Sequence, residues 1–257
     1  PEAAASPGDW EQVTFNNVLD MATGNFRSTG YMTDEDSTHM NAYHATQPYA
    51  ARIAAACDWP NAAGAGEQWV YRTSDTFIVT RAMQNFLSSQ TGEASDIFDY
   101  VVEQVYQPVG LTPGSLSSMR TADDNWHGQA EGGYGLWWVP EDIARLVTFL
   151  NDGGMSDGVQ VLHPDLLAAA LQQDVQDRGM LISPGRRYNN AIWANSYGPN
   201  QQFDCQFWVP NMLGVSGNVI AMFPNGITFY YFSDSHIFEW YGAIQEANKI
   251  HPICGGN

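Results

Sequence analysis

Basic residues are scarce in this sequence of 257 residues. Lysine occurs once, as Lys249, and 10 lysines and arginines stand against 28 aspartates and glutamates, which gives a formal net charge of -18. Such a surface repels nucleic-acid phosphates and anionic membranes, so neither is an expected partner. Charged residues make up only 15% of the chain, so the acidity comes from missing bases and not from acidic tracts. We interpret this composition as an extracellular adaptation and predict a secreted or periplasmic protein.

Long apolar runs are also missing. No stretch approaches the roughly 20 consecutive apolar residues that cross a bilayer, and the amino end does not have the form of a signal peptide. Neither absence settles where the protein resides. Because the sequence begins at Pro1 and not at methionine, we expect an upstream segment that has been removed, lies on another chain or is not included in this sequence.

Cysteine is rare, and its spacing excludes the common metal sites. The cysteines Cys57, Cys205 and Cys254 form no C-x-x-C pair, and the six histidines show neither an H-E-x-x-H nor a zinc-finger pattern. No metal or other cofactor is therefore predicted. One disulfide with one remaining thiol fits the count, and the sequence leaves the pairing open.

Helical periodicity dominates the earlier part of the chain. Apolar residues recur at helical spacing over 13–21 and over 97–106, where Pro108 is expected to stop the helix. Two further helices are predicted over 140–154, with Pro140 in its first turn, and over 163–174. With 44% hydrophobic residues over its whole length, the chain is expected to bury a large core.

The final third of the chain is rich in aromatic and β-branched residues. The segments 188–197, 202–210 and 218–234 predict strands, and a helix over 238–250 should cover the resulting sheet. Asn225-Gly226 predicts a hairpin between strands 219–223 and 227–232. This order of elements predicts an α+β fold with an antiparallel sheet. We expect two lobes, a mainly helical one at 1–180 and a sheet lobe at 181–257.

Tyr71 stands directly before an amphipathic helical pattern. Thr73, Ser74 and Asp75 are all helix-capping residue types, which would fix the backbone just after the tyrosine. A phenol held beside helix amides can have its pKa lowered enough to transfer protons. The alternative interpretation is an ordinary aromatic residue whose hydroxyl lies at the surface.

Five segments, in order, resemble a known family. They are WEQVTFNNVLDMATGNF, WVYRTSDTF, VYQPVGLTPGS, GGYGLWWVPEDIARLVTFLNDGG and VLHPDLLAAALQQD. Together they resemble the serine hydrolases of the class C β-lactamase and D-Ala-D-Ala carboxypeptidase type, including related esterases and amidases. The resemblance runs through nearly the whole chain and implies a β-lactamase/transpeptidase-like fold, incomplete at its amino terminus.

The resemblance assigns roles to several residues. It implies that Tyr71 is the proton relay and that Thr73 replaces a substrate-binding asparagine. Met212, Leu213 and Gly214 stand where the family has a Lys/His-Thr/Ser-Gly triad, which we expect to open the strand before the Asn225-Gly226 hairpin. Gly214 would let substrate approach the backbone, and the Val215 amide would be one of two oxyanion donors. Loss of the cation at Met212 and of the asparagine at Thr73 argues against β-lactams and peptidoglycan stems.

The nucleophile of the resembled family is not found in this sequence. Ser-x-x-Lys cannot occur, because the residue three positions before the single lysine, Lys249, is Glu246. A Gly-x-Ser-like stretch around Ser216 lacks the strand-to-helix setting of a nucleophile elbow. We therefore expect the serine and lysine on an amino-terminal segment or a second chain. That partner would pair with the aromatic edge strand at 227–232, which folded proteins normally cover.

Three classes of function remain open from the sequence. The first is a serine hydrolase that cleaves an ester or amide through an acyl-enzyme. The second is a catalytically inactive binding or assembly module on the same fold, and the third is a carbohydrate-binding protein. Trp137 and Trp126 could line an apolar substrate cleft in any of them, although tryptophan is more often part of a core.

Overall fold

The computed structural model describes residues 8–27, 34–35, 37–92, 94–123 and 128–255. The chain forms two compact units. The first comprises the chain up to Gln104 together with Pro113–Trp137, and the second comprises Val105–Thr112 together with the chain from Trp138 onwards.

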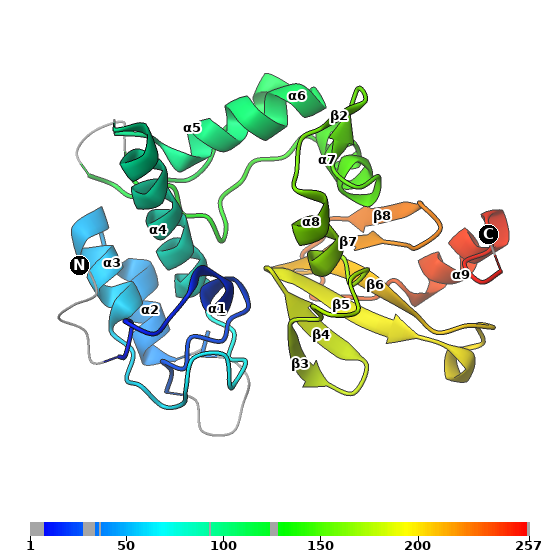
Figure 1. Cartoon of the computed structure of the whole chain (residues 1–257), viewed down its shortest axis with the longest axis horizontal. Coiled ribbons are helices and arrows are strands. Elements are labelled where there is room, and N and C mark those ends of the chain that lie inside the picture. The colour runs from blue at the N-terminus through cyan, green and yellow to red at the C-terminus, as the bar shows by residue number, and fades with distance from the viewer. Residues whose placement is uncertain (1–7, 28–33, 36, 93, 124–127, 256–257) are drawn as a thin grey trace. The chain divides into compact units, whose positions relative to one another are not determined.

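The first unit is built from helices (Figure 1). A π-helical turn at Val102–Tyr106 continues its last α-helix into the second unit, and a 3-10 turn spans Pro113–Ser115. The α-helices are α1 (Phe15–Leu19), α2 (Thr38–Ala45), α3 (Tyr49–Cys57), α4 (Thr73–Thr91) and α5 (Ile97–Val101).

The core of this unit joins α2, α3 and α4. Tyr43, Ile53 and Phe77, one from each helix, are buried in a common cluster with Trp59. Burial of an Ile or Phe side chain contributes about 1.5–3 kcal/mol. This packing fixes the amino-terminal half of α4, and therefore the backbone through which Tyr71 enters it.

The helix expected at 13–21 is shorter than predicted, Phe15–Leu19. Thr14 accepts a hydrogen bond from the Asn17 N–H and so sets the start of the helix. Met21 adopts a left-handed φ of 52°, which a helix cannot accommodate.

The expected stop of the 97–106 helix at Pro108 is wrong. Pro108 lies in a short helix, α6 (Gln107–Val109), which follows the π-helical turn at Val102–Tyr106 without a break, so the proline does not end the helical segment. The helical segment ends two residues later at Gly110, whose φ is 78°.

The second unit contains a six-stranded antiparallel sheet in which each strand pairs with the next along the chain. This confirms the predicted α+β fold. The strands are β3 (Met180–Ser183), β4 (Arg186–Asn189), β5 (Ile192–Tyr197), β6 (Phe207–Gly214), β7 (Asn218–Met222) and β8 (Thr228–Tyr231). A separate hairpin joins β1 (Met155–Ser156) to β2 (Val159–Gln160), and a 3-10 turn spans Pro199–Gln201.

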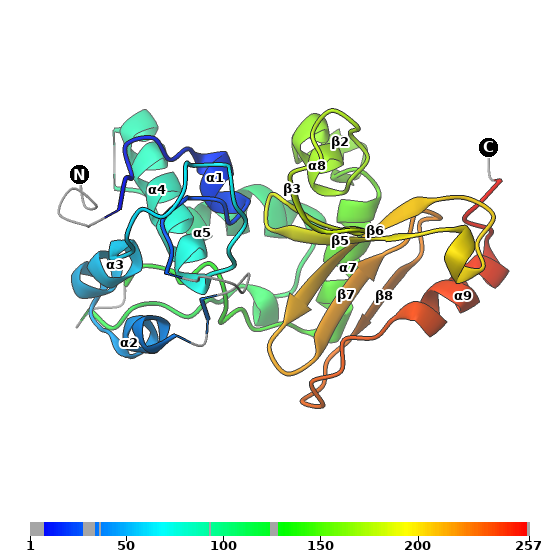
Figure 2. The same ribbon diagram turned by 90° about the horizontal axis from the view of Figure 1, so that it is seen from below.

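Helices cover both faces of this sheet (Figure 2). The helices α7 (Pro140–Asn151) and α8 (Pro164–Ala170) form a core cluster with Ile192 and Met222 on one face. On the other face α9 (Tyr241–Ile250) packs through Ile244 against Val209 and Val219. The predicted helices over 140–154, 163–174 and 238–250 are therefore present.

The compact units do not follow the expected division at residue 180. The expected division separated helices from strands by their position in the sequence. The compact units instead group the elements that pack against one another. Ile143 and Val147 of α7 are buried against the sheet, so this helix belongs with residues far beyond 180.

The hairpin expected at Asn225-Gly226 is confirmed. Met222 of β7 pairs with Thr228 of β8, antiparallel, across a short loop. The Gly226 N–H donates to the Phe223 carbonyl at 3.0 Å, and Gly226 has a φ of 82°. The Phe223 N–H also donates to the Ile227 carbonyl at 2.9 Å, so the loop proper has the three residues 224–226, with glycine in the left-handed position. It is not the two-residue Asn-Gly turn that the pair most often forms.

A disulfide joins Cys205, before β6, to Cys254, after α9. It closes a loop with a sequence separation of 49 and ties the carboxy-terminal helix to the sheet. Cys57 is buried in the core of the first unit and does not take part in this disulfide. The structure thus selects one of the pairings that the sequence left open.

Candidate functional site

Tyr71 is held at the entrance of α4 by main-chain hydrogen bonds on both sides. The Val70 N–H donates to the Met21 carbonyl at 2.8 Å, and the Asp34 N–H donates to the Tyr71 carbonyl at 3.1 Å. The phenol ring is half-buried, and its centre lies 6.2 Å from that of Trp69. The position of this side chain is therefore set by α4 and by two loops distant in sequence.

The expected capping role of Thr73, Ser74 and Asp75 is wrong. These residues form the first turn of α4, and the N-cap is Arg72, whose side chain makes no capping hydrogen bond. Asp75 instead accepts two 2.8 Å hydrogen bonds from the Arg72 guanidinium, and both side chains are buried. The capping prediction fails for Asp75 because its carboxylate forms a buried ion pair with Arg72 and does not cap the helix.

Glu35 caps α4 from a distant loop. Its carboxylate accepts hydrogen bonds from the Thr73 N–H and, at 3.0 Å, from the Thr73 hydroxyl. A negative charge at a helix amino terminus is favourable because it opposes the helix dipole. Sequence reasoning missed Glu35, because nothing in the local pattern links it to a helix 38 positions later.

The pKa of the Tyr71 hydroxyl is raised, whereas the sequence interpretation expected it to be lowered by the helix amides. Burial of the phenol is the main cause, and the nearby negative charge of Glu35 adds to it. A hydrogen bond with the Thr73 side chain acts in the opposite direction. In this environment Tyr71 is a protonated phenol at neutral pH.

The glycines of the GGYGL segment lie directly against α4. A methyl group on Gly132 would come within 2.0 Å of the Thr80 hydroxyl oxygen, and one on Gly133 within 2.1 Å of the Thr76 hydroxyl oxygen. Only glycine permits this approach. Two segments of the sequence resemblance, the Tyr71 element and GGYGL, are therefore neighbours in space.

A buried ion pair anchors the same segment. Arg52 of α3 lies 3.2 Å from the Glu131 carboxylate, and both side chains are at most 2% exposed. Arg52 also donates to the Tyr134 hydroxyl and lies over the Tyr43 ring, 4.7 Å from its centre. The side chains of Glu131 and Tyr134, which flank the two glycines, are thus tied to α3.

The structure describes one of the two tryptophans predicted to line a substrate cleft. Trp137 follows the GGYGL segment and is 62% exposed, as a residue that meets a ligand could be. Trp126 lies outside the described residues.

Met212, Leu213 and Gly214 end β6, so the expectation that they open the strand before the Asn225-Gly226 hairpin is wrong. Left-handed backbone at Ser216 (φ 72°) and Gly217 (φ 109°) makes a tight turn there. This turn divides the segment into two strands, and β7 follows. Met212 itself packs against the core cluster beneath α7 and α8.

The turn after β6 projects Val215 into solvent, where it is 84% exposed. The Gly217 N–H donates to the Gly214 carbonyl at 3.4 Å, and the Asn218 side chain donates to the Val215 carbonyl at 3.1 Å. Neither bond uses the Val215 N–H. Ser216 lies in this turn between two strands, which is not the setting of a nucleophile elbow.

Tyr71 belongs to the first compact unit, and Gly214 and Val215 belong to the second. Their convergence on a single acyl carbon, which a shared site requires, stays a prediction.

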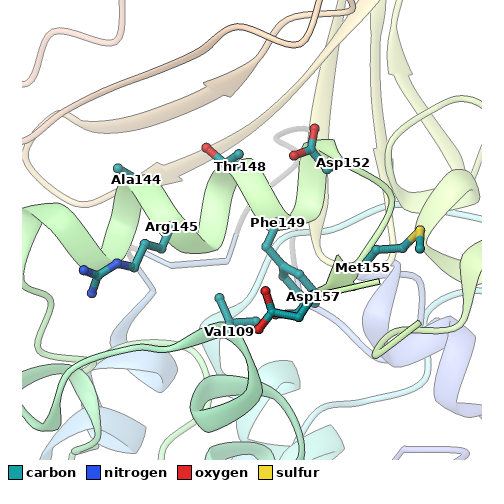
Figure 3. A pocket seen from close by; sticks show the side chains of 9 residues that line it. Val109, Ala144, Arg145, Thr148, Phe149, Asp152, Met155 and Asp157 are labelled. Carbon is teal, nitrogen blue, oxygen red and sulfur yellow. The ribbon is translucent and has the colours of Figure 1, made fainter. Parts of the chain in front are cut away.

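The second unit also has a surface cavity of about 440 Å³ between α6, α7 and the β1–β2 hairpin (Figure 3). Phe149 and Val109 contribute apolar surface, and Arg145, Asp152 and Asp157 contribute charge. No residue predicted for the catalytic site lines this cavity. It is a feature separate from the predicted chemistry.

Within the described ranges, no group of three or more His, Cys, Asp or Glu side chains is arranged to hold a metal ion. Over the same ranges, every helix is too short or too polar to cross a membrane.

Comparison with known proteins gives matches by structure and none by sequence. No protein-family model matches the sequence, and no curated protein matches it. Solved structures do match. A protein assigned as a 6-aminohexanoate-dimer hydrolase from Bacillus anthracis aligns with a TM-score of 0.62 and 16% identity over 97% of this chain. The aligned region is only 62% of that protein.

Two further structures agree. A D-stereospecific amidohydrolase from Streptomyces sp. aligns with a TM-score of 0.58 and 14% identity, over 91% of this chain and 72% of that one. A class C β-lactamase aligns with a TM-score of 0.55 and 16% identity, over 100% of this chain and 73% of that one. The resemblance inferred from the sequence is confirmed at the level of architecture: the chain has the fold of the penicillin-recognising serine hydrolases.

Proposed function

We propose that this protein is a serine hydrolase that cleaves an ester or amide bond through an acyl-enzyme. The observation that carries the proposal is the placement of Tyr71. Its backbone is fixed at the entrance of α4, its hydroxyl contacts Thr73, and the GGYGL segment packs on the same helix. This arrangement occurs in a fold shared with hydrolases.

Tyr71 passes the proton in the proposed mechanism. With a lysine beside it, the tyrosine accepts the proton of the serine hydroxyl during attack and returns it to the leaving group. The raised pKa of Tyr71 keeps the phenol protonated at neutral pH and so opposes the first of these steps. The lysine would then be needed to make the first step accessible, because a nearby cation stabilises the phenolate.

The turn after β6 is the proposed oxyanion site. Gly214 has no side chain to obstruct a substrate, and the Val215 N–H would donate to the developing negative charge. A second donor is expected from the nucleophilic serine's own backbone.

The nucleophile is proposed to lie outside these 257 residues. Lys249 is paired with Glu246 at 2.6 Å on an exposed face of α9, so the single lysine is far from any such role. The strand β8 is an edge of the described sheet, with half-buried Phe229, Tyr230 and Tyr231 along it. An edge of this kind suits pairing with a further strand, and we place the Ser-x-x-Lys segment beside it.

The proposed substrates are esters or amides whose binding does not depend on a substrate carboxylate held by the protein. Met212 and Leu213 provide neither the cation nor the hydroxyl that would hold such a group. The names of two structural neighbours, a 6-aminohexanoate-dimer hydrolase and a D-stereospecific amidohydrolase, are consistent with amide hydrolysis, while a third neighbour is a class C β-lactamase.

A fluorophosphonate probe tests the proposal, because it reacts covalently with activated serines. We expect the native protein to be labelled on a serine outside these 257 residues, found by peptide mapping. Labelling at Ser216 would overturn the assignment of the nucleophile. An unlabelled protein that does not hydrolyse ester or amide panels would favour the inactive binding module, which the replaced triad at Met212 and Leu213 also fits.

A further inference from the structure

We propose that the cavity between α6, α7 and the β1–β2 hairpin binds a linear zwitterion. Such a ligand has a carboxylate at one end, an ammonium group at the other and an apolar spacer between them. All the residues that line the cavity belong to the second unit. Binding there does not depend on Tyr71 or on the proposed hydrolase chemistry.

Side-chain hydrogen bonds to main-chain carbonyls hold α6 to the other two walls of the cavity. Arg145 of α7 donates to the Gly110 carbonyl, directly after α6, at 3.2 Å. The Ser156 hydroxyl of the hairpin donates to the Pro108 carbonyl of α6 at 2.7 Å. The cavity of about 440 Å³ is therefore preformed, and its volume lies in the usual range for small-molecule sites.

The Arg145 guanidinium provides the carboxylate-binding end of the site. Its Nη1 atom donates to the Asp142 carboxylate at 2.8 Å and to the Gly110 carbonyl, which holds the group in place. Within the described residues, Nε and Nη2 make no hydrogen bond. Because a guanidinium has five N–H donors, this second edge can bind a carboxylate through two parallel hydrogen bonds. The side chain is 48% exposed, so a ligand can reach it.

Asp152 and Asp157 provide the ammonium-binding end. Asp152 is the C-cap residue of α7, where the helix dipole also favours a cation. Asp157 lies in the turn between Ser156 and Val159 at a φ of 48°, as in a type I′ hairpin turn. Both side chains are exposed, and in the part of the chain that the structure describes neither carboxylate makes a hydrogen bond or ion pair. Two carboxylates are thus available to an ammonium group.

Apolar side chains lie between the two ends. Arg145 and Asp152 are about two turns apart on α7, which is about 10 Å along the helix axis. Phe149 lies between them on the helix, and Val109 of α6 lines the same cavity (Figure 3). An extended chain advances about 1.2 Å per bond. A linear spacer of about eight bonds would therefore place one charged group at each end.

The charges that line the cavity favour a zwitterion over simpler ligands. An anion alone would be repelled by Asp152 and Asp157, and a cation alone would gain nothing from Arg145. A metal ion needs more ligands than two aspartates, and the described ranges contain no group of three or more His, Cys, Asp or Glu arranged to hold one. A molecule with both charges satisfies both ends at once.

An NMR titration of the isotope-labelled native protein with 8-aminooctanoate tests the proposal, because its spacer has the required length. We expect the amide signals of α7 and of the hairpin to shift, and octanoate and octylamine, which each lack one charge, to bind about 5-fold more weakly. The shorter 4-aminobutanoate should also bind more weakly, since it cannot reach both ends. Shifts confined to other elements, or equal binding of octanoate and octylamine, would overturn the proposal.

Neutral variants at each end assign the two charges. Asparagine also tolerates a left-handed backbone, so Asp152→Asn combined with Asp157→Asn should keep the hairpin intact. We expect this double variant to bind 8-aminooctanoate no better than octanoate. Asp204→Asn, at an exposed aspartate of the same unit outside the cavity, should bind as the native protein does. Undiminished affinity in the double variant would refute the ammonium end.

Arg145→Gln tests the other end. We expect this variant to bind 8-aminooctanoate no better than octylamine, and undiminished affinity would refute the carboxylate end. The change also removes a partner of the buried Asp142 carboxylate. If Arg145→Gln does not fold for that reason, the comparison of 8-aminooctanoate with octylamine on the native protein decides the question. All these measurements record binding without turnover, and fluorophosphonate labelling reports on the hydrolase separately.

Discussion

The Tyr71 hydroxyl combines three influences that act on one proton. Burial and the Glu35 charge hold the proton on the phenol, and the hydrogen bond with Thr73 opposes them. A phenol in this state keeps its proton at neutral pH, so it cannot accept another from the serine. At the scale of single residues, the proposed chemistry therefore depends on a cation that lowers the pKa of Tyr71 when the nucleophile is present.

Replacing Tyr71 by phenylalanine removes one hydroxyl and leaves the ring in place. We expect Tyr71→Phe to lower kcat by about 100-fold or more, since general acid–base groups contribute factors of that order. The melting temperature should change little. Tyr100→Phe, on an exposed side chain of α5, is the matched control. Unchanged turnover in Tyr71→Phe would exclude the relay role.

The Glu35 charge raises the pKa of Tyr71, so its removal should lower that pKa. We expect the titration of Tyr71 in Glu35→Gln to shift towards lower pH, approaching the ordinary value near 10 from above. Carbon NMR of labelled tyrosine, with the signal assigned through Tyr71→Phe, measures the shift directly. A Tyr71 pKa that stays constant or rises would show that the two groups do not interact.

At the scale of elements, the contact between the GGYGL segment and α4 depends on two missing side chains. Gly132 has a φ of 76° and faces the Thr80 hydroxyl, and Gly133 faces that of Thr76. The ion pair of Arg52 and Glu131 holds the segment from the other side. These contacts place the loop and the amino-terminal half of α4 in a single arrangement.

The variant Gly132→Ala should therefore lower the free energy of unfolding by more than the cost of placing alanine at a positive φ. Gly92 has a nearly identical φ of 73°, but a methyl group there would meet nothing within 4 Å. We expect Gly92→Ala to lower the free energy of unfolding by about 1 kcal/mol, and Gly132→Ala by a further 1–3 kcal/mol from the clash. Denaturant unfolding measures both, and equal losses would disprove the close contact. Adding Thr80→Ala should recover part of the loss in Gly132→Ala.

At the scale of the whole molecule, the Cys205–Cys254 disulfide cross-links the second unit. In the described residues it is the only covalent link there besides the polypeptide chain. It joins the sheet to α9, which covers one of its faces. Because the disulfide closes a long loop, we expect its loss to destabilise the entire second unit.

Reduction should lower the free energy of unfolding by about 2–4 kcal/mol, since the closed loop restricts the unfolded chain. The double variant Cys205→Ser with Cys254→Ser should match the reduced protein and be insensitive to reductant. Calorimetry with and without reductant checks this. An equal response to reductant in the double variant would assign the effect to Cys57 instead.

The sequence alone determined the elements whose causes are local. Helical periodicity over 140–154 and the Asn225-Gly226 pair predicted α7 and the β7–β8 hairpin, because side-chain period and turn chemistry act over a few residues. The ordered segments around Tyr71 and GGYGL also sufficed for the fold, which the structural comparisons confirm.

Only the tertiary structure decided which distant groups meet. Glu35 replaces the expected local caps of α4, and Cys205 is paired with Cys254 and not with Cys57. Left-handed backbone after Gly214 ends β6 there, so Met212 lies at the end of β6 and not at the start of the hairpin strand where it was expected. The reason is physical: a capping carboxylate, a disulfide partner or a strand break is selected by packing between segments, and no local period of the sequence records that choice.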